Sequence, residues 1–328
     1  QLELWKKGED YEHLDLYQFG LLQQCVIVNR DRFTEDQTKV AAQSEFSKFV
    51  INLKPGSRPF NHSPKRCSPE QKEEVRRQIK ILLESGAIEQ SWSPFASRIL
   101  MVPKKVGRDG RKRWRMCIDY RDLNSMTVAD RYSLPRVDDC LNTMAGHRYF
   151  SAIDMTSGYY VCEIDEASRP YTAFRTPDGD LMQWRSLPFG LRNSPAHYMR
   201  MMNALFAGLT WRFLVLFVDD ICVFSNTFEE HIEYLCQVFG RSREGNIYMN
   251  PTKAYLMRAE VDFLGHTVTR GEIKPQTRLV DKLKRLGVPR DEKAVREWLG
   301  LAQFLAQYIK DYAKNTKGLR SLLKLPGT

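Results

Sequence analysis

The 328-residue sequence contains no long apolar run and opens with no signal peptide. A membrane-spanning helix needs about 20 apolar residues, so we expect an intracellular protein with no membrane partner. No C-x-x-C pair occurs, and the seven cysteines lie among apolar residues without metal-ligand spacing to histidine. We therefore expect buried thiols in a reducing compartment and no zinc site. The chain begins at Gln1, which indicates a processed product or a piece of a longer protein.

The balance of charge is basic. Lysine and arginine number 50 against 40 acidic residues, which gives a net charge of +10. This excess suits a polyanionic partner such as nucleic acid, whereas a solvated basic surface is the alternative. Hydrophobic residues make up 42% and charged residues 27% of the chain, as in ordinary globular proteins.

Two adjacent aspartates interrupt an apolar stretch at residues 211–225. Aromatic and aliphatic residues flank Asp219 and Asp220, which predicts two buried strands joined by a hairpin with both charges at its tip. Burying clustered charge is costly unless something compensates it, and a metal ion is the usual compensation. Ordinary turn chemistry explains the pair equally well when it is taken alone.

A second apolar strand, residues 149–154, ends on Asp154. The chain between Asp154 and Asp219 is long enough for a crossover that brings the two strands side by side. Three carboxylates would then meet at one sheet edge, as in two-metal sites whose ions lie about 4 Å apart and drive in-line phosphoryl displacement. Tyr159 and Tyr160 follow closely enough to wall a substrate there, although an aromatic at such a place is more often core.

Residues 99–120 have the pattern of a β-hairpin with a strongly basic loop. The loop and its flanks carry Lys104, Lys105, Arg108, Arg111, Lys112, Arg113 and Arg115, against Asp109 alone. Such a field suits a triphosphate or a phosphate backbone, and the alternative is a solvated charged turn. Arg115 alternates with apolar neighbours, so it has a defined face and is the best single phosphate candidate.

Capping signals predict helices around these strands. Ser68 and Gln71 form a capping-box pattern, as do Thr227 and Glu230, and Ser194 is expected as the N-cap of a third helix. Residues 261–269 predict one further strand, and residues 276–325 predict helices with basic faces. The order of strand, helix, hairpin and helix indicates an α+β fold, a sheet backed by helices.

Nine short segments complete the pattern. They are Ser93-Pro-Phe-Ala-Ser97, Trp114-Arg-Met-Cys-Ile-Asp-Tyr-Arg-Asp-Leu-Asn124, Arg131-Tyr-Ser-Leu-Pro-Arg-Val137, residues 150–160, Thr172-Ala-Phe-Arg-Thr176, Leu187-Pro-Phe-Gly-Leu191, Phe217-Val-Asp-Asp220, Asn250-Pro-Thr-Lys253 and Phe263-Leu-Gly-His266. In these segments and their order the chain resembles the reverse transcriptases of gypsy-like LTR retrotransposons, with retroviral enzymes more distant. Phe217 departs from the tyrosine that is usual in the family, a loss of one hydroxyl.

The resemblance implies an α+β right-hand polymerase with fingers, palm and helical thumb. Residues 1–50 would be an N-terminal extension. The fingers would occupy mainly residues 51–147 with the start of the palm, the palm mainly residues 148–268 with a fingers insertion around residues 165–190, and the thumb residues 269–328. No RNase H, protease or integrase domain is expected, because nothing follows the thumb.

The resemblance also assigns roles to side chains. Asp154, Asp219 and Asp220 match the palm carboxylates that hold two Mg²⁺ ions, with Mn²⁺ as a substitute, and Lys253 matches a lysine proposed to protonate pyrophosphate. The residues matched to dNTP binding are Lys105, Arg115, Tyr159, Phe189 and Gly190. Tyr159 among them would lie beneath the sugar and exclude a 2′-hydroxyl. The residues expected to lie against the primer strand are Phe263, Leu264, Gly265 and His266.

The implied function is an RNA- and DNA-templated DNA polymerase that extends a primer 3′-hydroxyl with dNTPs. The alternatives are a retroelement-derived nucleic-acid-binding or assembly protein that does not polymerise, and a metal-dependent nuclease that uses the same carboxylates. The expected partners are a template with its primer, dNTPs, and either a second copy or other domains of a Pol polyprotein. The expected location is cytoplasmic, in a virus-like particle, with access to the nucleus.

Overall fold

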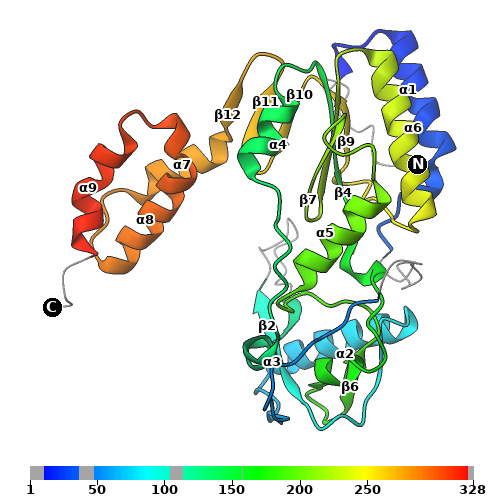
Figure 1. The fold of residues 1–328 in the computed structure, drawn as a ribbon, viewed down its shortest axis with the longest axis vertical. Helices are drawn as coiled ribbons and strands as arrows, with labels where there is room; N and C mark the ends of the chain where they lie inside the picture. The colour runs from blue at the N-terminus through cyan, green and yellow to red at the C-terminus, as the bar shows by residue number, and fades with distance from the viewer. Residues whose placement is uncertain (1–10, 37–47, 104–113, 157, 324–328) are drawn as a thin grey trace.

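The structure is a computed structural model that describes residues 11–36, 48–103, 114–156 and 158–323 (Figure 1). Its elements gather in three regions: a central sheet flanked by helices, a lobe below it, and a group of helices that projects to one side. The loop of the predicted basic hairpin, which contains Lys105, lies outside the described residues. Within the described ranges, no helix has the length and apolarity needed to cross a bilayer.

The central sheet is antiparallel with the strand order β7-β8-β4-β9. Its strands are β4 (Tyr149–Asp154), β7 (Leu214–Phe217), β8 (Asp220–Ser225) and β9 (Tyr255–Arg258). The predicted strand ending at Asp154 and the predicted hairpin at the aspartate pair are both confirmed. Their side chains are mostly buried, which agrees with the nearly continuous apolar runs of the sequence.

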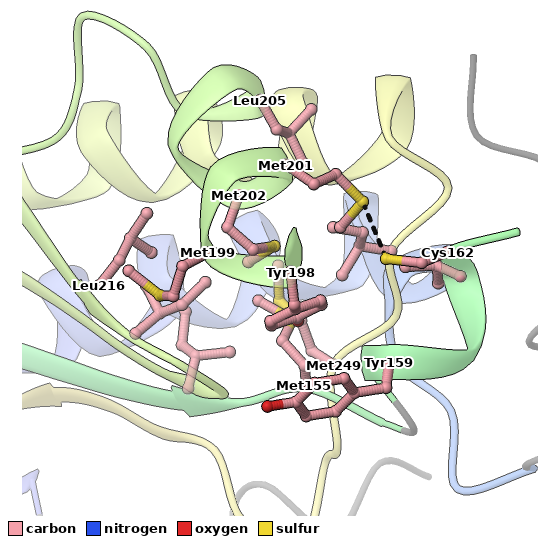
Figure 2. Close-up of a cluster of buried hydrophobic side chains, with 14 of the residues drawn as sticks. Met155, Tyr159, Cys162, Tyr198, Met199, Met201, Met202, Leu205, Leu216 and Met249 are labelled. Carbon is pink, nitrogen blue, oxygen red and sulfur yellow. Dashed lines mark hydrogen bonds between the residues drawn. The ribbon is translucent and has the colours of Figure 1, made fainter. Parts of the chain in front are cut away.

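Helices cover this sheet. They are α1 (Leu16–Val28), α4 (Val137–Met144), α5 (Ser194–Leu205) and α6 (Phe228–Glu244). The Thr227 side chain accepts a hydrogen bond from the Glu230 N–H, so that capping box is confirmed. The predicted N-cap of α5 was wrong by one residue, since Asn193 is the N-cap and Ser194 is the first helical residue. The Ser194 hydroxyl donates to the Pro188 carbonyl instead of capping the helix. Methionines of α5, including Met199 and Met202, are buried against the sheet as expected (Figure 2).

The lower lobe contains a five-stranded sheet of order β1-β6-β5-β2-β3. Its strands are β1 (Ile88–Gln90), β2 (Ser97–Pro103), β3 (Trp114–Ile118), β5 (Phe174–Arg175) and β6 (Leu181–Trp184), with helices α2 (Pro69–Glu84) and α3 (Arg121–Met126) beside it. The Ser68 capping box of α2 is confirmed. Strands from residues 174–184 thus join strands from residues 88–118, so two distant parts of the chain build one lobe.

A three-stranded sheet follows, formed by β10 (Glu260–Phe263), β11 (His266–Thr269) and β12 (Ile273–Pro275). The prediction of one strand over residues 261–269 was wrong. Leu264 and Gly265 have φ angles of 48° and 81°, and a two-residue turn with both angles positive reverses the chain there. An apolar pattern that continues through the turn concealed this hairpin.

The last helices are α7 (Thr277–Leu286), α8 (Glu292–Phe304) and α9 (Tyr312–Leu322), which confirms the predicted helical region. They project away from the central sheet (Figure 1). The short 3₁₀ segments among the described residues are η3 (Arg30–Arg32), η5 (Gly158–Val161), η6 (Arg169–Thr172) and η7 (Ala306–Tyr308).

The N-terminal segment packs behind the central sheet, an arrangement the sequence did not predict. Helix α1 lies along α6, and Arg243 of α6 makes a two-pronged ion pair with Asp31 at 2.9 and 3.1 Å. The chain then pairs with Met249: the Thr34 N–H donates to its carbonyl at 3.0 Å. An Asp15–Gln18 capping box starts α1 and is the sequence signal that would have revealed it.

Candidate active site

The three predicted carboxylates meet at one end of the central sheet. Asp154 is the last residue of β4 and Asp220 is the first of β8, and the two are direct partners in the antiparallel register. Phe217 pairs with Asp220, so Asp219 stands in the two-residue turn between β7 and β8. The fold therefore places Asp154, Asp219 and Asp220 together although they are far apart in the sequence.

The turn that carries Asp219 has an unusual backbone. Val218 has a φ of 55°, a left-handed conformation that β-branched residues rarely adopt, and its N–H donates to the Met199 sulfur at 3.0 Å. The Asp219 Oδ1 atom is buried and has no hydrogen-bond partner among the described residues. The turn therefore holds one carboxylate oxygen in a place where protein groups leave it unsatisfied.

The electrostatics of the site reflect this crowding of negative charge. Burial, followed by the charges of Asp154 and Asp220, raises the pKa of Asp219 to about 6. The pKa of Asp220 is also raised, first by desolvation and then by the charge of Asp154. Lys253 opposes both shifts, and its Nζ lies 3.1 and 3.2 Å from the two oxygens of Asp154.

The carboxylates supply oxygen donors of the kind that divalent cations prefer. Within the described part of the chain, no group of three or more His, Cys, Asp or Glu side chains is already arranged to hold a metal ion. Asp154 is instead engaged by Lys253. The unpartnered oxygen of Asp219 and the mutual repulsion of the carboxylates fit a cation, and Asp154 would have to turn from Lys253 to join in binding it.

Tyr159 lies among aromatic rings beside the carboxylates. Its ring stacks on Tyr198 with centroids 4.8 Å apart (Figure 2). The Phe189 ring meets it edge-on, with centroids 4.8 Å apart. Tyr159 is 5% exposed, whereas Phe189 is 54% exposed. The structure thus places the predicted sugar-excluding tyrosine next to the site with Phe189 covering it. The charge of Asp219 also contributes to a raised pKa of Tyr159, after burial.

The loop that carries Phe189 is fixed by a side chain that the sequence did not single out for this role. The Asn124 amide donates to the Gly190 carbonyl at 2.8 Å, and its Oδ1 accepts from the Arg192 N–H at 2.8 Å. Gly190 has a φ of 96°, which favours glycine. Asn124 therefore acts as a positioning residue for the loop, and only the folded chain reveals the contact.

Arg115 is exposed on β3, where it pairs with Val102 of β2. Its charge opposes the effect of burial on Tyr160, whose pKa is raised to about 12. The ring centroid of Tyr160 is 6.0 Å from that of Phe189. Arg115 thus lies close enough to Tyr160 for its charge to act on that phenol, although it comes from a different sheet.

A cleft of about 1120 Å³ runs from the carboxylates to the β10–β11 turn. Asp154, Asp220 and Lys253 line the cleft near the carboxylates, and Leu264 and Gly265 line it at the turn. Further basic lining residues are Arg258, Lys274 and Arg278. His13 of the N-terminal segment also lines it and contacts the Met257 carbonyl at 2.9 Å. No pattern in the sequence indicated that His13 reaches this cleft.

Two of the four predicted primer-contacting residues are turned inward. Phe263 is buried in the core, and the buried His266 ring stacks on Phe304 while its Nδ1 contacts the Tyr308 hydroxyl at 2.8 Å. Leu264 and Gly265 form the turn at the cleft. Of these four residues, Leu264 and Gly265 are therefore the ones whose turn a strand in the cleft would meet, while the buried side chains of Phe263 and His266 support that turn.

His231 of α6 links the two strands that end in carboxylates. Its Nε2 is 2.7 Å from the Ser151 hydroxyl of β4, and its Nδ1 is 2.9 Å from the Ser225 hydroxyl of β8. Burial lowers the pKa of His231 to about 3, so the ring is neutral at physiological pH. His231 escaped the sequence analysis because its partners come from distant segments.

Comparison with known proteins yields a family match and several relatives. Residues 102–268, half of the chain, match the family described as reverse transcriptase (RNA-dependent DNA polymerase). The chain is 36% identical over 251 residues to the retrovirus-related Pol polyprotein from transposon 297 of Drosophila melanogaster, a match that covers 76% of this chain and 24% of that protein. It is 32% identical over 281 residues to the enzymatic polyprotein of cauliflower mosaic virus (strain NY8153), covering 85% of this chain and 41% of that protein. The chain therefore spans less than half the length of these curated relatives.

Solved structures show the same fold. The foamy viral protease-reverse transcriptase in complex with an RNA/DNA hybrid aligns with a TM-score of 0.86 at 24% identity, over 99% of this chain and 43% of that one. The dRH form of that protein in complex with double-stranded DNA aligns with a TM-score of 0.87 at 24% identity, over 99% and 56% of the two chains. The predicted α+β architecture is thereby confirmed.

Proposed function

This chain belongs to the reverse transcriptase (RNA-dependent DNA polymerase) family, and on that premise we propose that it extends a primer 3′-hydroxyl with dNTPs on RNA and DNA templates. The similarity to Pol polyproteins of Drosophila transposons supports an origin in a gypsy-like LTR element. The observation that carries the proposal is the convergence of Asp154, Asp219 and Asp220 at one end of the central sheet, where Asp154 and Asp220 line the cleft.

The sheets support a division into fingers, palm and thumb. The five-stranded sheet joins residues 88–118 to residues 174–184, which favours fingers made of residues 51–147 with an insertion around residues 165–190. The central sheet would be the core of the palm, residues 148–268. The sheet β10–β12 runs past the proposed boundary at residue 269, so the helical part of the thumb begins at Thr277.

Asp154, Asp219 and Asp220 would hold the divalent cations. When bound, two Mg²⁺ ions, or Mn²⁺ in their place, supply charge that lowers the pKa of the primer hydroxyl and stabilises the leaving pyrophosphate. The orphaned Asp219 oxygen and the raised pKa values of the pair support this assignment. Lys253, which is released when Asp154 turns, would be free to protonate pyrophosphate, as the family resemblance implies.

The incoming nucleotide would lie between the lower lobe and the carboxylates. Arg115 would bind its phosphates, while Tyr159, Phe189 and Gly190 would line the sugar and base. Lys105 would join Arg115 from the basic loop, which lies outside the described residues. The aromatic group around Tyr159 supports this placement, because the exposed Phe189 ring is in edge-on contact with Tyr159.

The template and primer would occupy the cleft, with the Leu264–Gly265 turn against the primer strand. The complexes of the foamy viral protease-reverse transcriptase with an RNA/DNA hybrid and with double-stranded DNA support partners of this kind. A second copy or other domains of a Pol polyprotein would be further partners. A cytoplasmic particle with access to the nucleus would be the place of synthesis.

Primer extension on an RNA template and on a DNA template, with dNTPs and Mg²⁺, tests this function. Asp219→Asn should abolish extension while primer–template affinity stays within about twofold, because the substitution removes a metal ligand and leaves the cleft intact. Asp281→Asn on α7 makes the same charge change outside the site and should extend normally.

The outcomes separate the alternatives. Synthesis that persists in Asp219→Asn would contradict the metal role of that residue. Tight primer–template binding by the unaltered chain without any extension would favour a binding or assembly protein. Degradation of the substrate in the absence of dNTPs would favour a nuclease.

A further inference from the structure

Two cysteines on neighbouring helices have their sulfur atoms in contact. Cys25 of α1 and Cys236 of α6 lie 3.6 Å apart, sulfur to sulfur. Cys25 is 8% exposed, whereas Cys236 is open to solvent, and no other thiol–thiol contact occurs in the described ranges. The expectation that all the thiols are buried was therefore wrong, since Cys67 and Cys117 are also partly exposed.

We propose that Cys25 and Cys236 are a redox-modification site that forms a reversible disulfide between α1 and α6. The sulfur atoms must approach to about 2.05 Å, a shift of roughly 1.5 Å. Helices α1 and α6 lie side by side (Figure 1), so a rotation of the two short side chains supplies most of that movement. This site is separate from the carboxylates and does not depend on the proposed polymerase activity.

The two thiols have different chemical roles. The hydrogen bond from Cys25 lowers the pKa of Cys236 to about 7, against the opposing effects of burial and Glu233. The pKa of Cys25 is raised by the same hydrogen bond and by burial. Cys236 is thus the exposed thiolate that meets an oxidant, and Cys25 is the protected thiol that resolves the product.

The oxidant would be a peroxide or a small disulfide. With hydrogen peroxide, the Cys236 thiolate attacks one oxygen, the O–O bond breaks, and a sulfenic acid and hydroxide form. The Cys25 sulfur then attacks the Cys236 sulfur, the S–O bond breaks, and water leaves, so two thiols and one peroxide give one disulfide and two waters. With oxidised glutathione, a mixed disulfide forms first and two molecules of reduced glutathione leave.

The bond would fasten a segment that supports the catalytic end of the sheet. After α1, Asp31 is held by Arg243, and Thr34 pairs with Met249. The neighbouring Asn250 N–H donates to the Asp154 carbonyl at 2.9 Å. A covalent link at Cys25 would therefore restrain the chain that packs directly behind Asp154.

The test treats the full 328-residue protein with hydrogen peroxide or oxidised glutathione and maps its peptides without reduction. A Cys25–Cys236 cross-linked peptide should become the main product and disappear with dithiothreitol. The Tm should rise by about 5 °C on oxidation. The Cys67→Ser control should form the same cross-link, because Cys67 contacts neither thiol.

The variant Cys25→Ala tests whether Cys236 reacts because Cys25 lowers its pKa or only because Cys236 is exposed to solvent. This variant should accumulate sulfenic acid or a glutathione adduct on Cys236, and the pH at half-maximal alkylation of Cys236 by iodoacetamide should rise. Oxidation of Cys236 in the unaltered protein without the cross-link would overturn the proposal. An unchanged Tm would contradict the tether, and an unchanged alkylation profile would contradict activation by Cys25.

Discussion

The Tyr159 ring packs against the rings of Tyr198 and Phe189, which hold it in a fixed position. Tyr159→Ala should lower the preference for dNTPs over ribonucleotides by about tenfold or more, because the ring no longer fills the space of a 2′-hydroxyl. The ratio of kcat/KM for the two nucleotides measures this effect. Tyr159→Phe keeps the ring and should keep the preference. An unchanged ratio in the alanine variant would make Tyr159 a core residue only.

His231 gives the protein a pH-dependent stability with a definite sign. The pKa of His231 in the folded protein, about 3, lies below the ordinary value of 6.5. Between these two pH values the unfolded chain therefore binds a proton at His231 that the folded chain does not bind. The contribution of neutral His231 is complete above about pH 6.5 and is lost as the pH falls toward 3. The raised pKa of Asp219 acts in the opposite direction below about pH 6.

Comparison with a variant isolates the histidine. Between pH 7.5 and 5.5, the free energy of unfolding of the unaltered protein should fall by about 1 kcal/mol more than that of His231→Gln. Urea unfolding at the two pH values measures this difference, and the shared carboxylates cancel in it. Equal losses in both proteins would contradict a buried neutral imidazole.

At the scale of elements, the β10–β11 turn is the contact between the sheet region and the projecting helices. Gly265 has a φ of 81°, and a Cβ atom there would lie 2.6 Å from the Phe304 ring of α8. Gly265→Ala should lower the free energy of unfolding by about 1–3 kcal/mol and weaken primer–template binding, since both the turn and α8 must shift. Gly271→Ala has open space and should change neither.

Denaturant unfolding and fluorescence anisotropy with a labelled duplex measure the two effects of Gly265→Ala. A variant that is destabilised yet binds normally would separate the turn from the nucleic acid. If Gly265→Ala is as stable as Gly271→Ala, α8 can move to accept the added Cβ atom without a measurable cost in stability.

Elements with local signals were predictable, and those without were not. The Ser68 and Thr227 capping boxes place two helices within a residue, because the cap is a contact between neighbours in the sequence. The β10–β11 hairpin escaped prediction because Leu264, rather than Asn or Gly, takes the first left-handed position of its turn. Helix α1 is apolar around much of its surface, with exposed Leu16 and Ile27, so its periodicity was weak.

The residues of the candidate site also divide into those that local sequence patterns predict and those that they do not. Asp154, Asp219 and Asp220 were predictable because each ends or interrupts an apolar strand, and the sheet register then brings them together. Asn124 and His13 were not, because their roles depend on contacts with Gly190 and Met257, which are remote in the sequence. Single-residue roles follow from local pattern, whereas support roles follow from the assembled fold.

At the scale of the whole molecule, the net charge of +10 predicts a salt-sensitive grip on nucleic acid. Each phosphate contact adds about 0.9 to the slope of log affinity against log salt on a B-form duplex, so six contacts would lose about a thousandfold in affinity between 50 and 200 mM salt. Lys284→Ala on the exposed face of α7 should reduce the slope by about 1 if that lysine meets a phosphate.

Affinity measured across that salt range, with Lys80→Ala on α2 as the control, checks the prediction. Lys80 carries the same charge on the outer surface of the lower lobe, away from the cleft, and its loss should leave the slope unchanged. A flat response in the unaltered protein would contradict an electrostatic grip by the thumb.

The pairing of Asp154 with Asp220 across β4 and β8 has a consequence for how such a chain can diverge. A slip of one residue in this register would send one carboxylate to the opposite face, so neither strand tolerates an insertion or deletion. The connection between them contributes β7 to the same sheet and Tyr159 and Phe189 to the site, whereas β5 and β6 within it belong to the lower lobe. Lineages of this fold can therefore lengthen the β5–β6 turn to suit new templates while the pairing of the two acidic groups stays the same.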